Sequence, residues 1–174
     1  MQSSMRKQIA VGRWSLPDVV GLGGAVAGLL AGAVMVVLSP ILSLVTGIGI
    51  WEPPKLIAAT LLGPAVAEQT GFVLLPVLVG TLIHFVTSLI LGVIFGVVLN
   101  RMLHLTTDFG LPVLLGFVYG AMIFFVAWFI ILPLINPTLR DSYMGPVIAQ
   151  NLVFGVCLGL LYTMVRPRPY GVRR

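Results

Sequence analysis

Four long stretches of this 174-residue chain contain no Asp, Glu, Lys or Arg, and this feature limits its fold more than any other. They cover residues 19–51, 70–100, 109–139 and 142–165. Each is long enough to cross the bilayer, because ~20 apolar helical residues span the ~30 Å of hydrocarbon. Trimmed at prolines and polar ends, they predict an all-α membrane protein with four transmembrane helices at about 19–38, 76–99, 111–135 and 145–165. The chain then divides into a cytoplasmic segment 1–18, a four-helix domain 19–165 and a basic cytoplasmic tail 166–174.

Composition agrees with a multi-pass membrane protein. Only 9% of the residues are charged, whereas soluble domains carry about 25%. A β-barrel is not expected because barrel strands alternate apolar and polar residues, and these stretches are apolar on every side. The first stretch is longer than the roughly 7–15 apolar residues of a signal peptide, and no small-residue cleavage pattern follows it. We therefore expect an uncleaved first span.

Basic residues gather on one side of the four predicted spans. The eight residues on this side are Arg6, Lys7, Arg13, Arg101, Arg166, Arg168, Arg173 and Arg174. Because cytoplasmic loops are rich in Lys and Arg, this side and both termini are expected in the cytoplasm. The net charge of +5 is thus explained by orientation in a cytoplasmic membrane, and no nucleic-acid partner is expected.

Glycines four residues apart occur in every predicted span. They are Gly24, Gly28 and Gly32; Gly92 and Gly96; Gly116 and Gly120; and Gly155 and Gly159. Small residues let helices approach closely, and such packing drives helix association in lipid. We expect these faces to hold a four-helix bundle together. The alternative, favoured by the third glycine of the first span, is that this face contacts a partner subunit.

A weak internal similarity relates the first two spans to the last two. A shift of 92 residues aligns Gly24 with Gly116 and Gly28 with Gly120, and a shift of 67 aligns His84 with Asn151 and Gly92 with Gly159. This similarity predicts a parallel repeat of two helical hairpins, unlike the inverted repeats of many transporters. The difference between the shifts places an insertion in the loop between the first two spans.

That loop is expected to hold a short helix at about 54–63, on the outer membrane surface. The residues around the start of this helix, expected at the membrane interface, are Trp51, Glu52, Pro53, Pro54 and Lys55. Proline is favoured in a first helical turn, and tryptophan belongs at the headgroups. We interpret Glu52, Lys55 and Glu68 as solvated loop residues. A re-entrant segment that lines a cavity is the sharper alternative.

Two further aromatic residues are expected at the bundle surface. Trp128 should face lipid or a partner, and Tyr162 should anchor the chain at the interface.

His84 is the one ionisable residue of the second span. An ionisable group inside a membrane span costs free energy to bury and often has a function. We expect a neutral imidazole that hydrogen-bonds across to Gln150 and Asn151, with contact to a quinone or another ligand as the first alternative and proton transfer as the second.

No sequence motif indicates catalysis. Nucleotide-binding loops, metal-ligand spacings and nucleophile elbows are missing, and Cys157 is the single cysteine. We therefore expect no enzyme, no metal site and no cofactor bound by this chain alone, while contact with a lipid or a quinone stays open.

Two segments carry a resemblance to a known family. These are WEPPKLIAATLLGPA at 51–65 and IHFVTSLILGVIFG at 83–96. The chain resembles a family of small, uncharacterised bacterial four-span membrane proteins, which implies the bacterial cytoplasmic membrane and brings no catalytic residue. In type it is also similar to supernumerary subunits of respiratory and photosynthetic complexes.

Two functional hypotheses follow. The first is an accessory subunit that packs against larger membrane proteins, in an electron-transfer complex. The second is a small transporter or channel, with a homo-oligomer as one arrangement and a polar site around His84 and Asn151 at the membrane midplane.

Overall fold

The computed structural model describes residues 21–99, 110–142 and 144–165, and all regular secondary structure in this part of the chain is helical. Its four candidate spans are α1 (Leu22–Thr46), α3 (Leu74–Val97), a third helix over Gly110–Ile135 and α7 (Met144–Val165). The third consists of α4 (Gly110–Val126), the π-helical turn η3 (Ala127–Ile131) and α5 (Leu132–Ile135). The four predicted spans are confirmed, and the chain is a multi-pass membrane protein.

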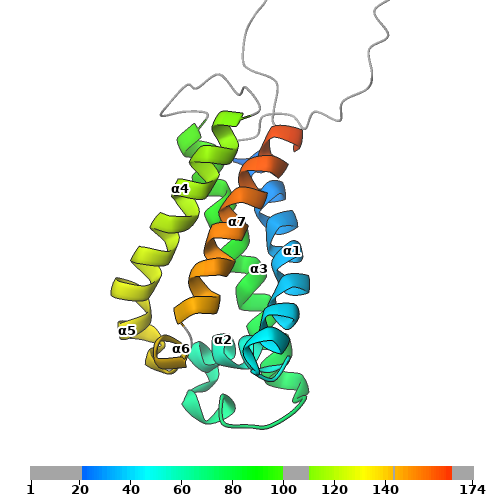
Figure 1. Ribbon diagram of the computed structural model, residues 1–174, viewed down its shortest axis with the longest axis vertical. Helices are drawn as coiled ribbons and strands as arrows, with labels where there is room; N and C mark the ends of the chain where they lie inside the picture. Colours follow the sequence, from blue (N-terminus) through cyan, green and yellow to red (C-terminus); the bar gives the residue numbers. More distant parts are fainter. Residues whose placement is uncertain (1–20, 100–109, 143, 166–174) are drawn as a thin grey trace, which may run out of the picture.

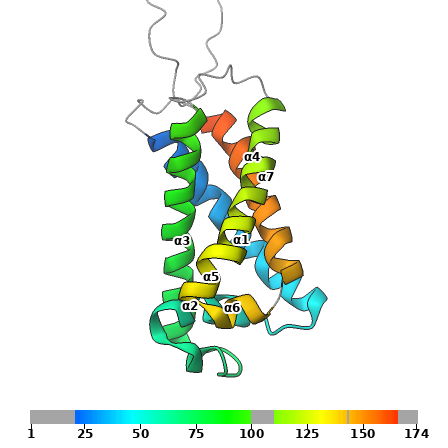
Figure 2. The ribbon, with the colours of Figure 1, turned by 90° about the vertical axis from the view of Figure 1, so that its left-hand side faces the viewer.

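The helices form an open bundle in the spatial order α3, α1, α7, α4 (Figures 1 and 2). Close packing joins α1 to α3, α1 to α7 and α4 to α7, whereas α3 and α4 are not among the closely packed pairs. Helices α1 and α4 start at the same end of the bundle, and α3 and α7 both return to it (Figure 1). The hairpins α1–α3 and α4–α7 therefore run in the same direction.

Glycine contacts repeat between these two hairpins. A Cβ added to Gly92 would collide with the carbonyl of Gly24 and the backbone of Gly28, and a Cβ on Gly155 would meet Gly116 and Gly120 in the same way. The shift of 92 residues therefore relates equivalent positions of α1 and α4, but the shift of 67 is wrong for α3 and α7. By its contacts, Gly92 corresponds to Gly155, which is a shift of 63. This alignment of α3 with α7 differs by four residues, about one helical turn, from the shift of 67 that matched more side chains in the sequence.

Helix α1 continues beyond its predicted end at residue 38, through Pro40 to Thr46. A proline inside a helix removes one backbone hydrogen bond, but transmembrane helices tolerate it because serine and threonine hydroxyls and neighbouring helices serve the freed groups. The carbonyl that Pro40 leaves without an N–H partner is that of Val36, and in the next turn the Ser43 hydroxyl adds a bond to the Ser39 carbonyl at 2.9 Å. The helix ends at Gly47 instead, whose φ of 74° permits the reversed turn, and the N–H of Ile48 donates back to Ser43 O at 2.9 Å.

Three short helices lie across the end of the bundle opposite the start of α1, which we call the α2 end (Figure 1). They are α2 (Glu52–Leu62), the 3₁₀ turn η1 (Pro64–Val66) and α6 (Pro137–Ser142). Helix α2 packs on α3, and a Cβ on Gly80 would collide with the carbonyl of Pro54. The predicted short helix between the first two spans is thus confirmed, with its start at Glu52.

The third span contains a π-helical turn, where the N–H of Leu132 donates to Ala127 O, five residues back. Pro133 has no N–H for the carbonyl of Phe129, which favours such a local rearrangement. The turn aims Trp128 inward, where it is 8% exposed and stacks on Phe124 with ring centroids 5.8 Å apart. The expected lipid-facing position of Trp128 is therefore wrong.

Tyr162 is also buried, at 3% exposure, in the core between α3 and α7. Its ring packs edge-on against Phe95. The expected interfacial anchor is therefore wrong, because the glycines of α3 leave room for the ring beside Gly96.

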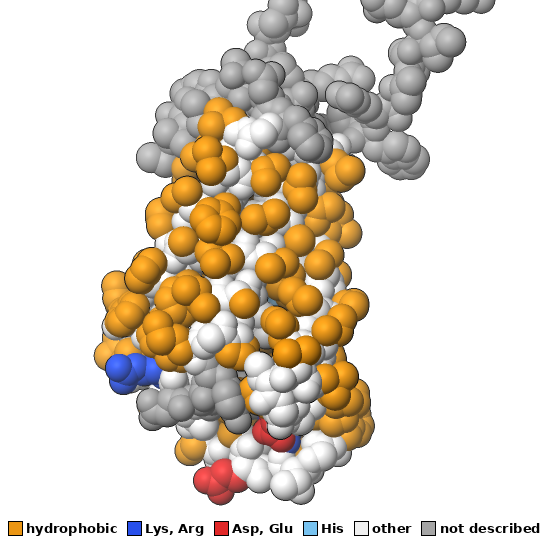
Figure 3. All heavy atoms as spheres, in the orientation of Figure 1, with side chains coloured by type: hydrophobic (Ala, Val, Ile, Leu, Met, Phe, Trp, Pro, Cys, Tyr) orange, Lys and Arg blue, Asp and Glu red, His pale blue; other side chains and the backbone are white. Residues whose placement is uncertain are grey.

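The sides of the bundle are covered with exposed apolar side chains, as lipid requires (Figure 3). Figure 3 also shows the coloured acidic and basic side chains of this face near the α2 end. The segments 1–20, 100–109 and 166–174 lie outside the described residues, and with them lie all eight basic residues that predict the orientation.

Candidate ligand cavity between α3 and α4

A cavity of about 490 Å³ opens between α3 and α4, where the backbones of these two helices are not closely packed. Its walls come from α3 and α4–α5, Met35 of α1 and Phe154 of α7 lie among its lining residues, and α2 contributes at the α2 end. The lining is mostly aliphatic, with a small number of polar groups. This is the usual character of small-molecule sites, which enclose about 300–1,000 Å³.

Polar side chains from the middle of the spans meet in this cavity. They are His84, Thr87 and Ser88 of α3, Tyr119 of α4, and Gln150 and Asn151 of α7. The sequence predicted His84, Gln150 and Asn151 as a polar group, and the structure places all three around one space. No Asp, Glu, Lys or Arg lines it within the described part of the chain.

His84 has a different partner from the one expected. Its Nε2 lies 3.0 Å from the carbonyl oxygen of Gly32 on α1. The expected bond to Gln150 or Asn151 is wrong, because α3 packs on α1 and the side-chain-free surface at Gly32 brings the carbonyl within reach. Since a carbonyl only accepts, Nε2 is the donor.

The two amides of α7 are bound by other groups. Asn151 Nδ2 donates to Val147 O in its own helix at 2.8 Å, and Gln150 Nε2 donates to Ser39 Oγ of α1 at 3.5 Å. Both amide oxygens are without a hydrogen-bond partner among the described residues.

Ser88 is the most enclosed polar group of the cavity. The residue is 3% exposed and packs against Gly32. The hydroxyl of Thr81 in the same helix donates to Val77 O at 2.7 Å, the usual bond for such a residue. No corresponding bond of Ser88 exists within the described residues, so its hydroxyl keeps its full hydrogen-bonding capacity.

Tyr119 connects the two helices that border the cavity, a role that the sequence analysis missed. Its hydroxyl donates to Leu91 O of α3 at 2.9 Å, and its ring packs against Phe95 with centroids 5.3 Å apart. The signal was a single tyrosine in an otherwise apolar part of the third span.

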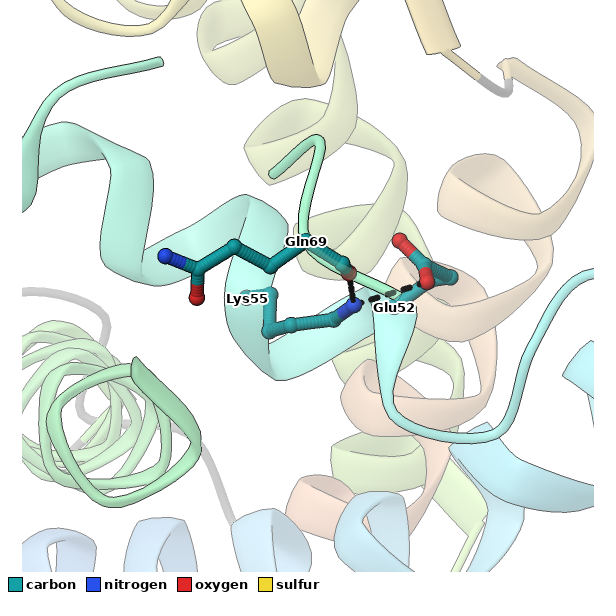
Figure 4. Close-up of polar contacts among 3 residues, drawn as sticks. All are labelled: Glu52, Lys55 and Gln69. Carbon is teal, nitrogen blue, oxygen red and sulfur yellow. Dashed lines mark hydrogen bonds and ion pairs between the residues drawn. The ribbon is translucent and has the colours of Figure 1, made fainter. Parts of the chain in front are cut away.

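Lys55 lies at the α2 end and is completely buried, so its assignment to a solvated loop is wrong. Its Nζ donates to Glu52 Oε1 at 2.8 Å and to the carbonyl of Gln69 (Figure 4). A buried ammonium needs such partners to offset its lost hydration. Glu68, by contrast, is exposed, and Trp51 packs edge-on against Phe72 at 4.8 Å.

Asn136 is a second residue that the sequence analysis missed. Its Oδ1 accepts from Leu139 N at 3.0 Å and so caps α6, with Pro137 in the favoured first position. Its Nδ2 donates to Leu56 O and Thr60 Oγ1 of α2, both at 2.8 Å. An Asn directly before a Pro is the local signal that could have predicted the cap.

Compared with protein-family models, curated proteins and solved structures, the chain matches none of them. The resemblance to a bacterial four-span family is therefore supported in the number of spans alone.

Proposed function

We propose that this protein binds a small amphipathic molecule inside the membrane, in the cavity between α3 and α4, and that it belongs to the transporter class of the two hypotheses. One observation carries the proposal. The polar side chains of three different spans converge on one cavity, and His84 Nδ1 and the amide oxygens of Gln150 and Asn151 have no partner among the described residues. Because no buried side-chain N or O atom of these residues lacks a partner, these atoms are accessible to a ligand. Unsatisfied polar groups are costly at membrane depth, so a bound polar group would stabilise this arrangement.

The accessory-subunit hypothesis loses one of its supporting observations. The third glycine of α1 favoured a partner contact, but Gly24, Gly28 and Gly32 all lie against α3. This face is therefore occupied within the chain, and the absence of catalytic motifs supports a binding protein equally well. We keep the expectations that the chain is not an enzyme and that it binds no metal.

Met122 offers a way to test the proposal without disturbing the core. It lines the cavity and is 56% exposed, whereas Val118, one turn earlier in α4, is 48% exposed and does not line it. Tryptophan at position 122 would fill the entrance, and tryptophan at 118 would add the same bulk on the lipid side.

The experiment is native purification in mild detergent, followed by mass spectrometry of everything that is bound. We expect a stoichiometric small molecule in the wild type and in Val118→Trp, and its loss in Met122→Trp. Equal amounts in both variants would contradict the proposal. A fixed set of larger membrane proteins in place of a small molecule would restore the subunit hypothesis.

We also propose that the chain lies in the bacterial cytoplasmic membrane, with the α2 end outside and both termini in the cytoplasm. The eight basic residues that flank the other ends of the spans support this orientation. In a Cys157→Ser background, Glu68→Cys should react with a membrane-impermeant maleimide in intact spheroplasts. Reaction only after lysis would reverse the orientation.

A further inference from the structure

The cavity contains three acceptor atoms that no described residue uses, beside the hydroxyls of Thr87 and Ser88, and these acceptors indicate what kind of molecule fits. His84 provides the clearest case. Because Nε2 donates to Gly32 O, a neutral imidazole carries its proton there and keeps a lone pair on Nδ1. His84 Nδ1 has no hydrogen bond to any described residue, so the ring has an acceptor to spare.

The side-chain amides of Gln150 and Asn151 on α7 also have a free acceptor atom. In Asn151 the nitrogen is turned to the backbone of its own helix, and in Gln150 it is turned to Ser39. Each bond uses one of the two N–H groups of its amide, and the oxygen on the opposite side is the acceptor left for a ligand. Ser88 adds a hydroxyl, which both accepts and donates.

The rest of the cavity lining argues against a charged ligand. The described lining residues include no acidic or basic side chain other than the imidazole. A buried ammonium or carboxylate would have no counter-charge there, and its desolvation would oppose binding. The aliphatic lining, which includes Ile83, Leu91 and Ile123, suits an apolar body.

We infer that the cavity binds a neutral amphiphile that carries a hydroxyl donor, such as a phenol, a reduced quinol or a long-chain alcohol, in preference to a ligand with acceptors alone, such as an oxidised quinone. The inference depends on the proposed function, since it concerns the same cavity. The hydroxyl donates its one hydrogen to His84 Nδ1 or to the Asn151 amide oxygen and accepts from Ser88, while the apolar body fills the space between α3 and α4.

The test uses two compounds that differ by one methyl group. 4-Octylphenol has a donor, and 4-octylanisole keeps the ring, the chain and the oxygen but cannot donate. Affinity is read from the rise of the unfolding temperature with compound concentration, for the full chain in nanodiscs. We expect the phenol to bind about 3- to 10-fold more tightly, the effect of one hydrogen bond.

Two variants separate the possible failures. Ser88→Ala should fold like the wild type, since its hydroxyl has no protein partner, and should weaken binding of the phenol more than that of the anisole. Met122→Trp should abolish binding of both compounds. Equal affinities that are lost in Met122→Trp would overturn the donor preference and leave the cavity proposal standing. Binding that survives in Met122→Trp, or no binding at all, would overturn both.

1-Dodecanol distinguishes the two sources of such a hydroxyl. Affinity like that of the phenol would point to aliphatic alcohols among the lipids as ligands. Preference for the phenol would point to aromatic compounds of the quinol type. Both results support the donor class, and a dodecanol effect that is insensitive to Met122→Trp would count against it.

Discussion

Asn136 Nδ2 donates to the backbone carbonyl of Leu56 at 2.8 Å, and this bond ties the short helix of the first hairpin to the end of the third span. Asn136 is 2% exposed, and its three hydrogen bonds reach α2 twice and α6 once. One amide thus caps one helix and fastens another, so the α2 end acts as a single unit.

We expect Asn136→Ala to lower the free energy of unfolding by about 1–3 kcal/mol, because it leaves buried partners unsatisfied. Hydrogen exchange should rise in α2 as well as in α6. Thr46→Ala is the control, since that hydroxyl bonds only within α1 and is exposed. Faster exchange in α6 alone would mean that the link to α2 contributes nothing.

Gly92→Ala and Gly155→Ala should be equally damaging, because both glycines meet backbone atoms of the facing helix in the same pattern. Overpacking typically costs 1–3 kcal/mol, and backbone yields less than a side chain, so we expect at least ~3 kcal/mol. The measurement is the unfolding midpoint in mixed micelles with SDS. Gly145→Ala is the control, since nothing lies within 4 Å of its added Cβ. A mild effect in one hairpin only would contradict the repeat of contacts.

Lys55→Met retains most of the buried stem but removes Nζ from Glu52 and Gln69. Both partners keep some contact with solvent, so the cost should be about 1–2 kcal/mol. It should appear as a lower unfolding temperature and as faster exchange in 52–62. Glu68→Gln, an exposed acid, should leave both unchanged. Unaltered stability in Lys55→Met would show that its stem, and not its charge, is what α2 requires.

Tyr119→Phe removes the bond to Leu91 O but keeps the ring against Phe95. Bonds between transmembrane helices contribute ~0.6 kcal/mol on average and up to ~1.7, so the change in stability should be small. We expect a wider separation of α3 and α4 instead, measured as the distance between spin labels at Leu89→Cys and Leu114→Cys in a Cys157→Ser background. The labelled wild-type Tyr119 protein is the reference, and an unchanged distance would mean that ring packing alone holds the two helices.

The number of spans, their approximate positions and the glycine steps followed from the sequence, because apolar length and small side chains are local properties. Even the helix between the first two spans was predictable from Pro53-Pro54 and Gly63. The tertiary structure decided which faces meet. Spans that are apolar on every side contain no periodic signal for an inward face, so the register of Gly92 against Gly24 and the bond from His84 to Gly32 depend on backbone contacts between helices. The inward turn of Trp128 depends on the π-helical turn of the third span. The cavity depends on the backbone contacts as well: glycines bring α1 to α3 and α4 to α7, and no such contact closes α3 against α4.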